Sequence, residues 1–275
     1  MNTAGLDLTI LGPACVAGLL VLATHVPLGM QVLERGIVFI DLAIAQVAGI
    51  GVIAADALGW EPQGIAVQVA AVGAALLGAL ALTWTEKRWP QIQEALIGVL
   101  FVLASCAGIL LLAGNPHGGE HLKDLLVGQI LWVGWGQLAP VAVLSAVVLG
   151  LWFGLGARLG RLGFYLLFAV SVTASVQLAG VYLVFASLIV PALATGRLAK
   201  GRRLAVAYGL GAASYALGLV LSALFDLPSG AVVVLVMAAA AVVAGVALSG
   251  ASANANRRGA RRAPDEFANL AEDEP

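Results

Sequence analysis

Long apolar stretches separated by short polar clusters run along almost the whole chain. A helix needs about 20 residues to cross a bilayer core about 30 Å thick. Seven stretches have roughly that length: Leu8–Leu33, Ile37–Ala55, Ile65–Trp84, Ala95–Gly114, Leu138–Ala157, Leu204–Phe225 and Ala231–Leu248. The alternating apolar and polar positions of a membrane β-barrel are absent, so helices are the remaining way to span a bilayer. The pattern predicts an all-α polytopic membrane protein.

An eighth stretch, Phe164–Thr195, is 32 residues long and contains no charge. It is too long for one ordinary span and too short for two long ones. If it breaks near Ala179–Gly180 into two short helices, nine crossings result and 13 of the 14 Lys and Arg residues share one side. A single crossing gives a 9 to 5 division instead. Because Lys and Arg concentrate on the cytoplasmic side, we expect about nine transmembrane helices, with the N-terminus outside and the C-terminus in the cytoplasm.

Two segments differ from this pattern. Leu122–Trp135 is amphipathic, and it is too polar and interrupted to cross the membrane, so an interfacial or partly re-entrant helix is expected there. The last 26 residues are polar, first basic and then acidic, which is typical of disorder. We therefore predict one transmembrane domain at 1–249 and a disordered cytoplasmic tail at 250–275, whose arginine cluster would lie near anionic lipid headgroups.

Composition supports a membrane protein and narrows the chemistry. Hydrophobic residues make up 61% of the chain, charged residues 11%, and the mean hydropathy is +1.00. A soluble domain carries about a quarter charged residues. The net charge of −1 gives no sign of nucleic-acid binding. A G-x-x-x-x-G-K-[ST] phosphate loop and an H-E-x-x-H zinc-protease pattern are both absent, so we expect a non-enzymatic protein with no permanently bound cofactor.

Two ionisable residues fall inside the first two apolar stretches. An ionisable group at bilayer depth is costly and marks a functional site by default. A tight turn at Glu34–Gly36 would make an antiparallel hairpin, which brings His25 to the depth of Asp41 and Gln46. Imidazole, carboxylate and amide oxygen suit zinc, manganese or iron in a weak transit site. The alternative is a buried hydrogen bond between His25 and Asp41 that locks the hairpin.

The loop after the fourth stretch contains a second group of metal-binding residue types. His117, Glu120 and His121 follow one another in the segment HGGEH. Two His four residues apart with a carboxylate between them can chelate a divalent ion if the segment is helical. By the predicted topology this loop is extracytoplasmic. The alternative is a flexible solvated loop with incidental histidines.

Hydroxyl and amide residues also occur on the first half of the 32-residue stretch: Ser171, Thr173, Ser175 and Gln177. Small and hydroxyl residues in membrane helices are typical of close helix packing. Lining of a polar path is the other interpretation.

Four segments resemble, in order and spacing, the permease subunits of ATP-binding-cassette importers for zinc, manganese and iron. GVYLVFASLIVPALATGRL is similar to the family's Gly-Val-x-Leu-Val run closed by Ile-Pro-Ala. GMQVLERGIVFID is similar to its first-to-second-helix turn, LLVGQILWV to an outer-face element, and DLPSG to its last extracytoplasmic turn. Together these matches run from about residue 29 to residue 248.

The resemblance implies a fold similar to that of the cobalamin and metal-chelate importer permeases. It further implies a second permease copy, most simply a homodimer, in the cell membrane of a prokaryote. A separate cytoplasmic ATP-binding subunit and an extracytoplasmic metal-binding protein complete such an importer. The expected function is import of a divalent transition metal, zinc first and then manganese or iron.

The sequence departs from the family pattern at two places. The family's second helix carries an Asp and, four residues later, a His, where this chain has Leu42 and Gln46. The loop that docks the ATPase is shortened to about GLGARLGRLG, in which Arg158 and Arg161 are candidates for contacting acidic residues of the ATPase. Two alternatives stay open: the same architecture importing a metal chelate or another small solute, and a proton-driven secondary transporter.

Overall fold

Helices account for all the regular secondary structure in the residues that the computed structural model describes, which are 8–61, 64–113 and 118–247. The elements, in chain order, are α1 (Leu8–Arg35), α2 (Ile40–Ala57), α3 (Ile65–Arg88), η2 (Pro90–Ile92), α4 (Gln93–Leu112), α5 (Gly118–Val127), η3 (Ile130–Trp132), α6 (Trp135–Leu155), η4 (Gly156–Leu159), α7 (Gly160–Ala179), α8 (Val181–Ala194), α9 (Lys200–Phe225) and the helix Ser229–Ala247. Eight of them are long and apolar enough to span a membrane, and α8 is a shorter apolar helix. The predicted all-α fold is confirmed. The predicted tail at 250–275 lies outside the described residues.

The 32-residue stretch is divided as expected, at Gly180. This residue has φ 79° and ψ 161°, a combination open essentially only to glycine. The first helix is longer than predicted, because α7 begins at Gly160 rather than Phe164. Arg161 can lie in the first turn because its guanidinium group reaches outward and pairs with Glu86 of α3 at 3.7 Å.

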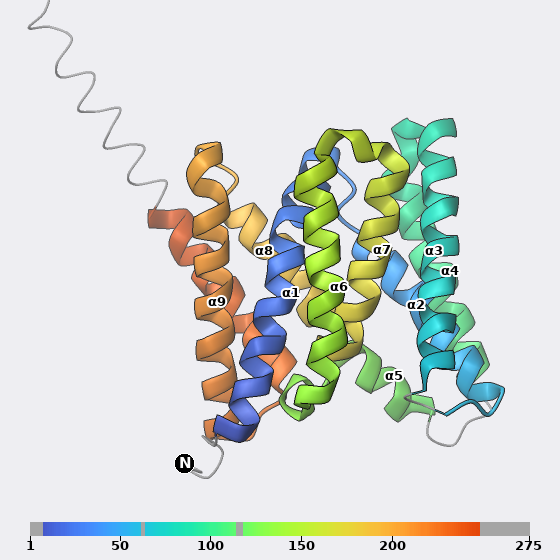
Figure 1. Ribbon diagram of the computed structural model, residues 1–275, viewed down its shortest axis with the longest axis horizontal. Coiled ribbons are helices and arrows are strands. Elements are labelled where there is room, and N and C mark those ends of the chain that lie inside the picture. The colour runs from blue at the N-terminus through green and yellow to red at the C-terminus, as the bar shows by residue number, and fades with distance from the viewer. Residues whose placement is uncertain (1–7, 62–63, 114–117, 248–275) are drawn as a thin grey trace, which may run out of the picture.

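The spans form two groups that meet at α7 (Figure 1). In one group α2 packs against α3 and α4, and in the other α1 packs against α8, α9 and α6. Of the hydrophobic stretch of α7, 61% is buried, against 17% for α6 and for Ser229–Ala247. This distribution places α7 at the centre and leaves α6 and the last helix with wide exposed apolar surfaces.

The ends of several helices are linked at the side predicted to be cytoplasmic. Glu34 of α1 forms an ion pair with Arg203 of α9 at 3.2 Å. The next residue, Arg35, lies over the ring of the buried Phe164 of α7, 4.3 Å from its centroid. Gln93 of α4 donates to the carbonyl oxygen of Leu82, which belongs to α3, at 3.0 Å. These contacts connect α1, α3, α4, α7 and α9 at one end of the bundle.

At the other end, the α5–η3 connection and the α7–α8 break come together so closely that only glycine fits at the contact. A Cβ on Gly128, between α5 and η3, would collide with the backbone of Ala179 and Gly180. A Cβ on Gly180 would collide with the backbone of Val127 and Gly128. The end of α5 therefore rests on the break between α7 and α8. A short helix that is not among the candidate spans, α5, occurs in this region, but it runs from Gly118 to Val127 and so begins and ends earlier than the predicted Leu122–Trp135.

Candidate functional site

A small cavity with polar side chains lies among α2, α4, α5, α7 and α8, and α3 contributes Ala71 to its wall. Its volume is about 20 Å³. That is just above the roughly 10–15 Å³ that a single water needs by the same kind of measure. The cavity can therefore hold one small species, such as a water or an ion that has lost much of its hydration shell.

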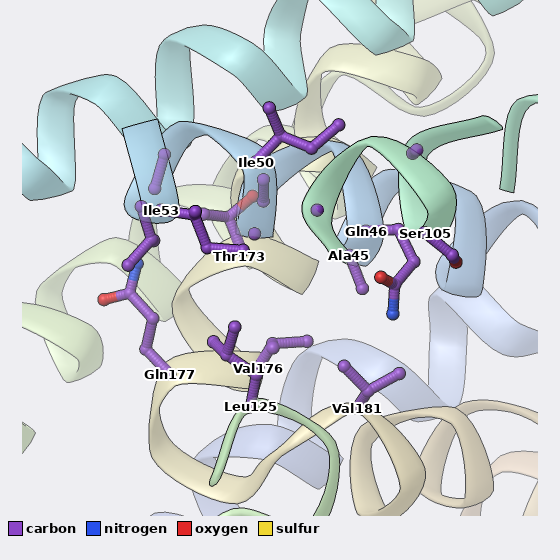
Figure 2. Close-up of a pocket in the computed structure, with 16 residues that line it drawn as sticks. Ala45, Gln46, Ile50, Ile53, Ser105, Leu125, Thr173, Val176, Gln177 and Val181 are labelled. Carbon is purple, nitrogen blue, oxygen red and sulfur yellow. The ribbon is translucent and has the colours of Figure 1, made fainter. Parts of the chain in front are cut away.

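Four uncharged polar side chains line this cavity: Gln46 of α2, Ser105 of α4, and Thr173 and Gln177 of α7. Figure 2 shows the Gln46 amide extending into the open space beside Ser105, with Val176 and Val181 bordering the space from below. Gln177 lies on the opposite flank, near Ile53. Polar side chains of α2, α4 and α7 thus line the cavity, and the Gln177 amide is directed toward Ile53 rather than toward Gln46.

The two hydroxyl groups are held in place by their own helices. Ser105 Oγ donates to the carbonyl oxygen of Phe101 at 2.8 Å, and Thr173 Oγ1 donates to that of Ala169 at 2.8 Å. Because each hydroxyl group donates its hydrogen to a carbonyl oxygen of its own helix, the lone pairs of the hydroxyl oxygen remain available to a ligand in the cavity. Hydroxyl oxygens with free lone pairs attract a cation as a ligand.

Small residues make room for the cavity on the α2 side. Ala45, Ala48 and Gly49 line it together with Gln46. Leu125 of α5 and Val181 of α8 close it with apolar side chains. Since α5 rests on the α7–α8 break, the same close contact at Gly128 and Gly180 fixes the position of both closing elements.

Of the three residues expected to form an intramembrane transit site, Gln46 alone lines the cavity. His25 lies on a different part of the bundle. On α1, Gly18 faces Tyr215 of α9 and Gly29 faces the backbone of Leu188 of α8. Positions 18, 25 and 29 are spaced by seven and four residues, so they share one helix face. His25 is therefore directed toward α8 and α9.

The predicted hairpin packing of the first two helices is wrong. α1 and α2 are not a closely packed pair, because α1 packs against α8 and α9 while α2 packs against α3 and α4. The intervening turn extends to Phe39, so α2 begins only at Ile40 and Asp41 lies in its first turn. The turn length suggested a hairpin, but contacts with other helices decide where each helix lies.

The alternative of a hydrogen bond between His25 and Asp41 does not occur in the structure. Both residues are fully buried. His25 Nδ1 donates to the carbonyl oxygen of Val21 at 2.9 Å, which leaves Nε2 without a partner. Both carboxylate oxygens of Asp41 also lack a hydrogen-bond partner.

The candidates in the loop after α4 are only partly described. His117 lies outside the described residues. The backbone of Glu120 and His121 belongs to α5, which starts at Gly118, but their side chains lie outside the described part of the structure. Among the described residues, no group of three or more His, Cys, Asp or Glu side chains is placed to hold a metal ion.

Of the candidate docking arginines, Arg158 lies in the short α6–α7 connection and Arg161 lies in the first turn of α7. This connection is the single turn η4. Arg158 is exposed, and Arg161 is engaged in part with Glu86.

At the opposite end of the bundle there is a wider cleft, of about 430 Å³, beside η3 and the start of the last helix. Lys123, Gln129 and Asp226 are among the residues that line it. The cleft and α5 together form the surface predicted to face the outside.

Of the four polar residues of the cavity, Thr173 and Gln177 were recognised in the sequence but interpreted mainly as packing residues. Ser105 was missed. It lies in an otherwise apolar stretch that reads as a plain lipid-facing helix, so no signal in the sequence distinguishes it.

Comparison with known proteins places these features in context. The family model described as "ABC 3 transport family" matches residues 7–155 and 151–247. The uncharacterized membrane protein slr2045 of Synechocystis sp. is 30% identical over 189 residues, which cover 61% of this chain and 67% of that protein. A probable iron transport system membrane protein of Haemophilus influenzae is 26% identical over 202 residues, 66% of this chain and 74% of that protein. The manganese transport system membrane protein MntC of Halalkalibacterium halodurans is 26% identical over 233 residues, 76% and 77% of the two chains.

Two solved structures share the fold. PsaBC from Streptococcus pneumoniae in complex with Fab matches with a TM-score of 0.67 and 24% identity, over 86% of this chain and 89% of the other. An inward-facing conformation of a putative metal-chelate type ABC transporter matches with a TM-score of 0.63 and 20% identity, over 84% of each chain. The predicted similarity to the metal-chelate importer fold is therefore confirmed.

Proposed function

Since the chain belongs to the ABC 3 transport family, we propose that it is the membrane permease subunit of an ATP-driven importer of a divalent transition metal ion. The family resemblance inferred from the sequence is confirmed by this membership. The observation that best supports the proposal is the cavity at Gln46 and Gln177, where four polar side chains gather among apolar membrane helices. Polar side chains within membrane helices face the interior of the bundle or a cavity, which is the position of residues that line a substrate path.

The donor set suggests which metal to test first. Amide and hydroxyl side chains line the cavity, and His25 is not among its lining residues. Oxygen ligands suit manganese better than they suit softer ions. Zinc was the first expectation from the sequence. We now propose manganese and iron ahead of it, and the oxygen donors and the relatives named for iron and manganese transport support this order.

The remaining parts of the importer are proposed as separate chains. ATP hydrolysis would come from a cytoplasmic ATP-binding subunit, because this chain has no phosphate-binding loop. A second copy of the permease would complete the path across the cell membrane. A metal-binding protein would dock at the outer end, near α5 and the cleft at Asp226, where the HGGEH segment would receive the ion.

We place the ATPase contact at the α6–α7 turn. Arg158 is exposed there, and with Arg161 it offers positive charge to acidic residues of the partner. This placement agrees with the predicted orientation, in which the Arg-rich ends of the helices and the C-terminus are cytoplasmic.

Uptake measurements test the function directly. The permease is co-expressed with its candidate ATPase, and cells are assayed for accumulation of manganese, iron and zinc. We expect ATPase co-purification and uptake of at least one ion that stops when the ATPase carries an inactivating substitution. Uptake that continues without ATPase activity and collapses with the proton gradient would instead establish the secondary transporter. Uptake only of a metal bound to a small organic chelator would establish the chelate alternative.

A further inference from the structure

Gln93 is a buried amide that joins three helices at the end of the bundle predicted to be cytoplasmic. It is the first residue of α4 and is 4% exposed. Its Nε2 donates to the carbonyl oxygen of Leu82 in α3 at 3.0 Å and to the Tyr165 hydroxyl of α7 at 3.3 Å. Its Oε1 accepts from Thr85 Oγ1, also of α3, at 3.0 Å. One side chain therefore holds the start of α4 to the end of α3 and to the second turn of α7.

Tyr165 lies close to the turn at which we place the ATPase contact. α7 begins at Gly160, directly after η4, and Tyr165 is fully buried in its second turn. Arg161 lies four residues before Tyr165 on the same helix face, and it pairs with Glu86 of α3 at 3.7 Å. The first two turns of α7 are thus linked to the corner between α3 and α4 by a partly exposed ion pair and by a buried hydrogen bond.

Gln93 and Tyr165 lie on the helix faces that line the cavity. In α4, Gln93 and the cavity-lining Ala104 are eleven residues apart. In α7, Tyr165 and the cavity-lining Val176 are also eleven residues apart. Eleven residues make three helical turns, so each pair shares one face and is separated by about 16 Å along its helix. The hydrogen bond between Gln93 and Tyr165 therefore joins two walls of the cavity, three turns closer to the predicted cytoplasmic side.

This hydrogen bond is a direct link between two walls that are not packed closely together. In the described part of the chain, α4 packs against α2, whereas α4 and α7 are not a closely packed pair. If α7 moved and α4 did not, the buried amide of Gln93 and the buried hydroxyl of Tyr165 would lose each other as partners. Because unpaired polar groups are costly in a buried setting, we expect α4 to follow α7.

We propose that Gln93 is a positioning residue, which makes the α4 wall of the cavity move with α7 when the ATPase displaces the α6–α7 turn. This inference rests on the proposed function and adds to it the route by which ATP hydrolysis acts on the cavity. The movement passes from α7 through the Tyr165 hydroxyl to Gln93, and then along α4 to Ser105. Without this hydrogen bond, ATP is still hydrolysed, but fewer ions are imported for each ATP.

Two buried tyrosines provide a matched pair of variants. Tyr165→Phe removes the hydroxyl that contacts Gln93 and keeps the ring beside Phe164, whose ring centroid is 5.7 Å away. Tyr215→Phe removes a hydroxyl that lies 2.9 Å from Ser187 Oγ, between α9 and α8. Each variant loses one buried hydrogen bond between helices, but only the bond of Tyr165 lies between the α6–α7 turn and the cavity.

The test compares Tyr165→Phe, Gln93→Leu and Tyr215→Phe with the wild type in proteoliposomes that contain the complete importer. Initial rates of uptake and of ATP hydrolysis are measured together for manganese, iron and zinc ions, which gives the number of ions imported for each ATP. We expect Tyr165→Phe and Gln93→Leu to lower this ratio by about two- to thirty-fold, the range that residues between two coupled sites produce. Tyr215→Phe should keep the wild-type ratio. A merely structural role of Tyr165 would lower uptake and hydrolysis together and leave the ratio unchanged.

A wild-type ratio in Tyr165→Phe would overturn the inference and leave the proposed function standing, even where Gln93→Leu fails to fold. A ratio that falls in Tyr165→Phe but not in a folded Gln93→Leu would overturn the role of Gln93. Equal losses in Tyr165→Phe and Tyr215→Phe would also overturn it, because they would indicate a general loosening of the bundle. If the wild type imports none of these ions with ATP, the proposed function fails, and the inference fails with it.

Discussion

The contact between Gly128 and Gly180 predicts a large effect of one methyl group. In Gly180→Ala, the new side chain has to adopt φ 79° and ψ 161°, which costs a non-glycine residue about 1–3 kcal/mol. Its Cβ also collides with the backbone of Val127 and Gly128, and overpacking of this kind costs about 1–3 kcal/mol more. The sum of about 2–6 kcal/mol is a large part of a typical stability of about 5–15 kcal/mol.

Thermal unfolding of the purified protein in detergent measures this effect. At about 2–4 °C for each kcal/mol, the melting temperature of Gly180→Ala should fall on the order of 10 °C. Gly73→Ala is the control, because this glycine lies within α3 and nothing lies within 4 Å of an added Cβ. Alanine there should leave the protein as stable as before or raise its stability by about 0.5–1 kcal/mol. Equal melting temperatures for Gly180→Ala and the wild type, recorded at one heating rate, would refute the close contact and the glycine-only break.

Two further substitutions test other parts of the structure. Tyr215→Phe removes a hydroxyl that lies 2.9 Å from Ser187 Oγ between α9 and α8, so stability should fall by about 0.6 kcal/mol and by no more than about 1.7, measured by the same melting assay. A loss as large as that of Gly180→Ala would contradict this assignment. Arg158→Glu should reduce the ATPase that co-purifies with the permease, because it reverses an exposed charge at the α6–α7 turn. Lys123→Glu, at the opposite end of the bundle, is the control for charge reversal and should retain the ATPase.

The helical segments and the break between α7 and α8 could be predicted from the sequence because the lengths and the charges of the apolar stretches indicate them. The broken helix pair followed from counting Lys and Arg on each side, and the break at Gly180 agrees with the structure. Family membership followed from four short segments in a fixed order. Helix ends were less certain, as α7 shows: Arg161 is charged, but it fits within the helix by pairing with Glu86.

The candidate site could be predicted only in part, because its geometry depends on which helices pack together. Counting residues outward from the Glu34–Gly36 turn shows which positions of two successive helices lie at the same depth in the membrane. It does not show which side of each helix faces another helix. It therefore grouped His25 with Gln46, although the two residues face different helices. Ser105 could not be found from its own neighbours in the sequence. It joins the cavity because α4 packs against α2.

The break at Gly180 also gives the cavity an electrical asymmetry. The last turn of α7 ends in carbonyl groups equivalent to about half a negative charge, and the first turn of α8 ends in amide groups equivalent to about half a positive charge. Gln177 belongs to the first of these helix ends and Val181 to the second, and both line the cavity. The field of each end decays within about one turn, so the two flanks differ. A cation is attracted toward the Gln177 flank and repelled from the Val181 flank, whereas an anion experiences the reverse.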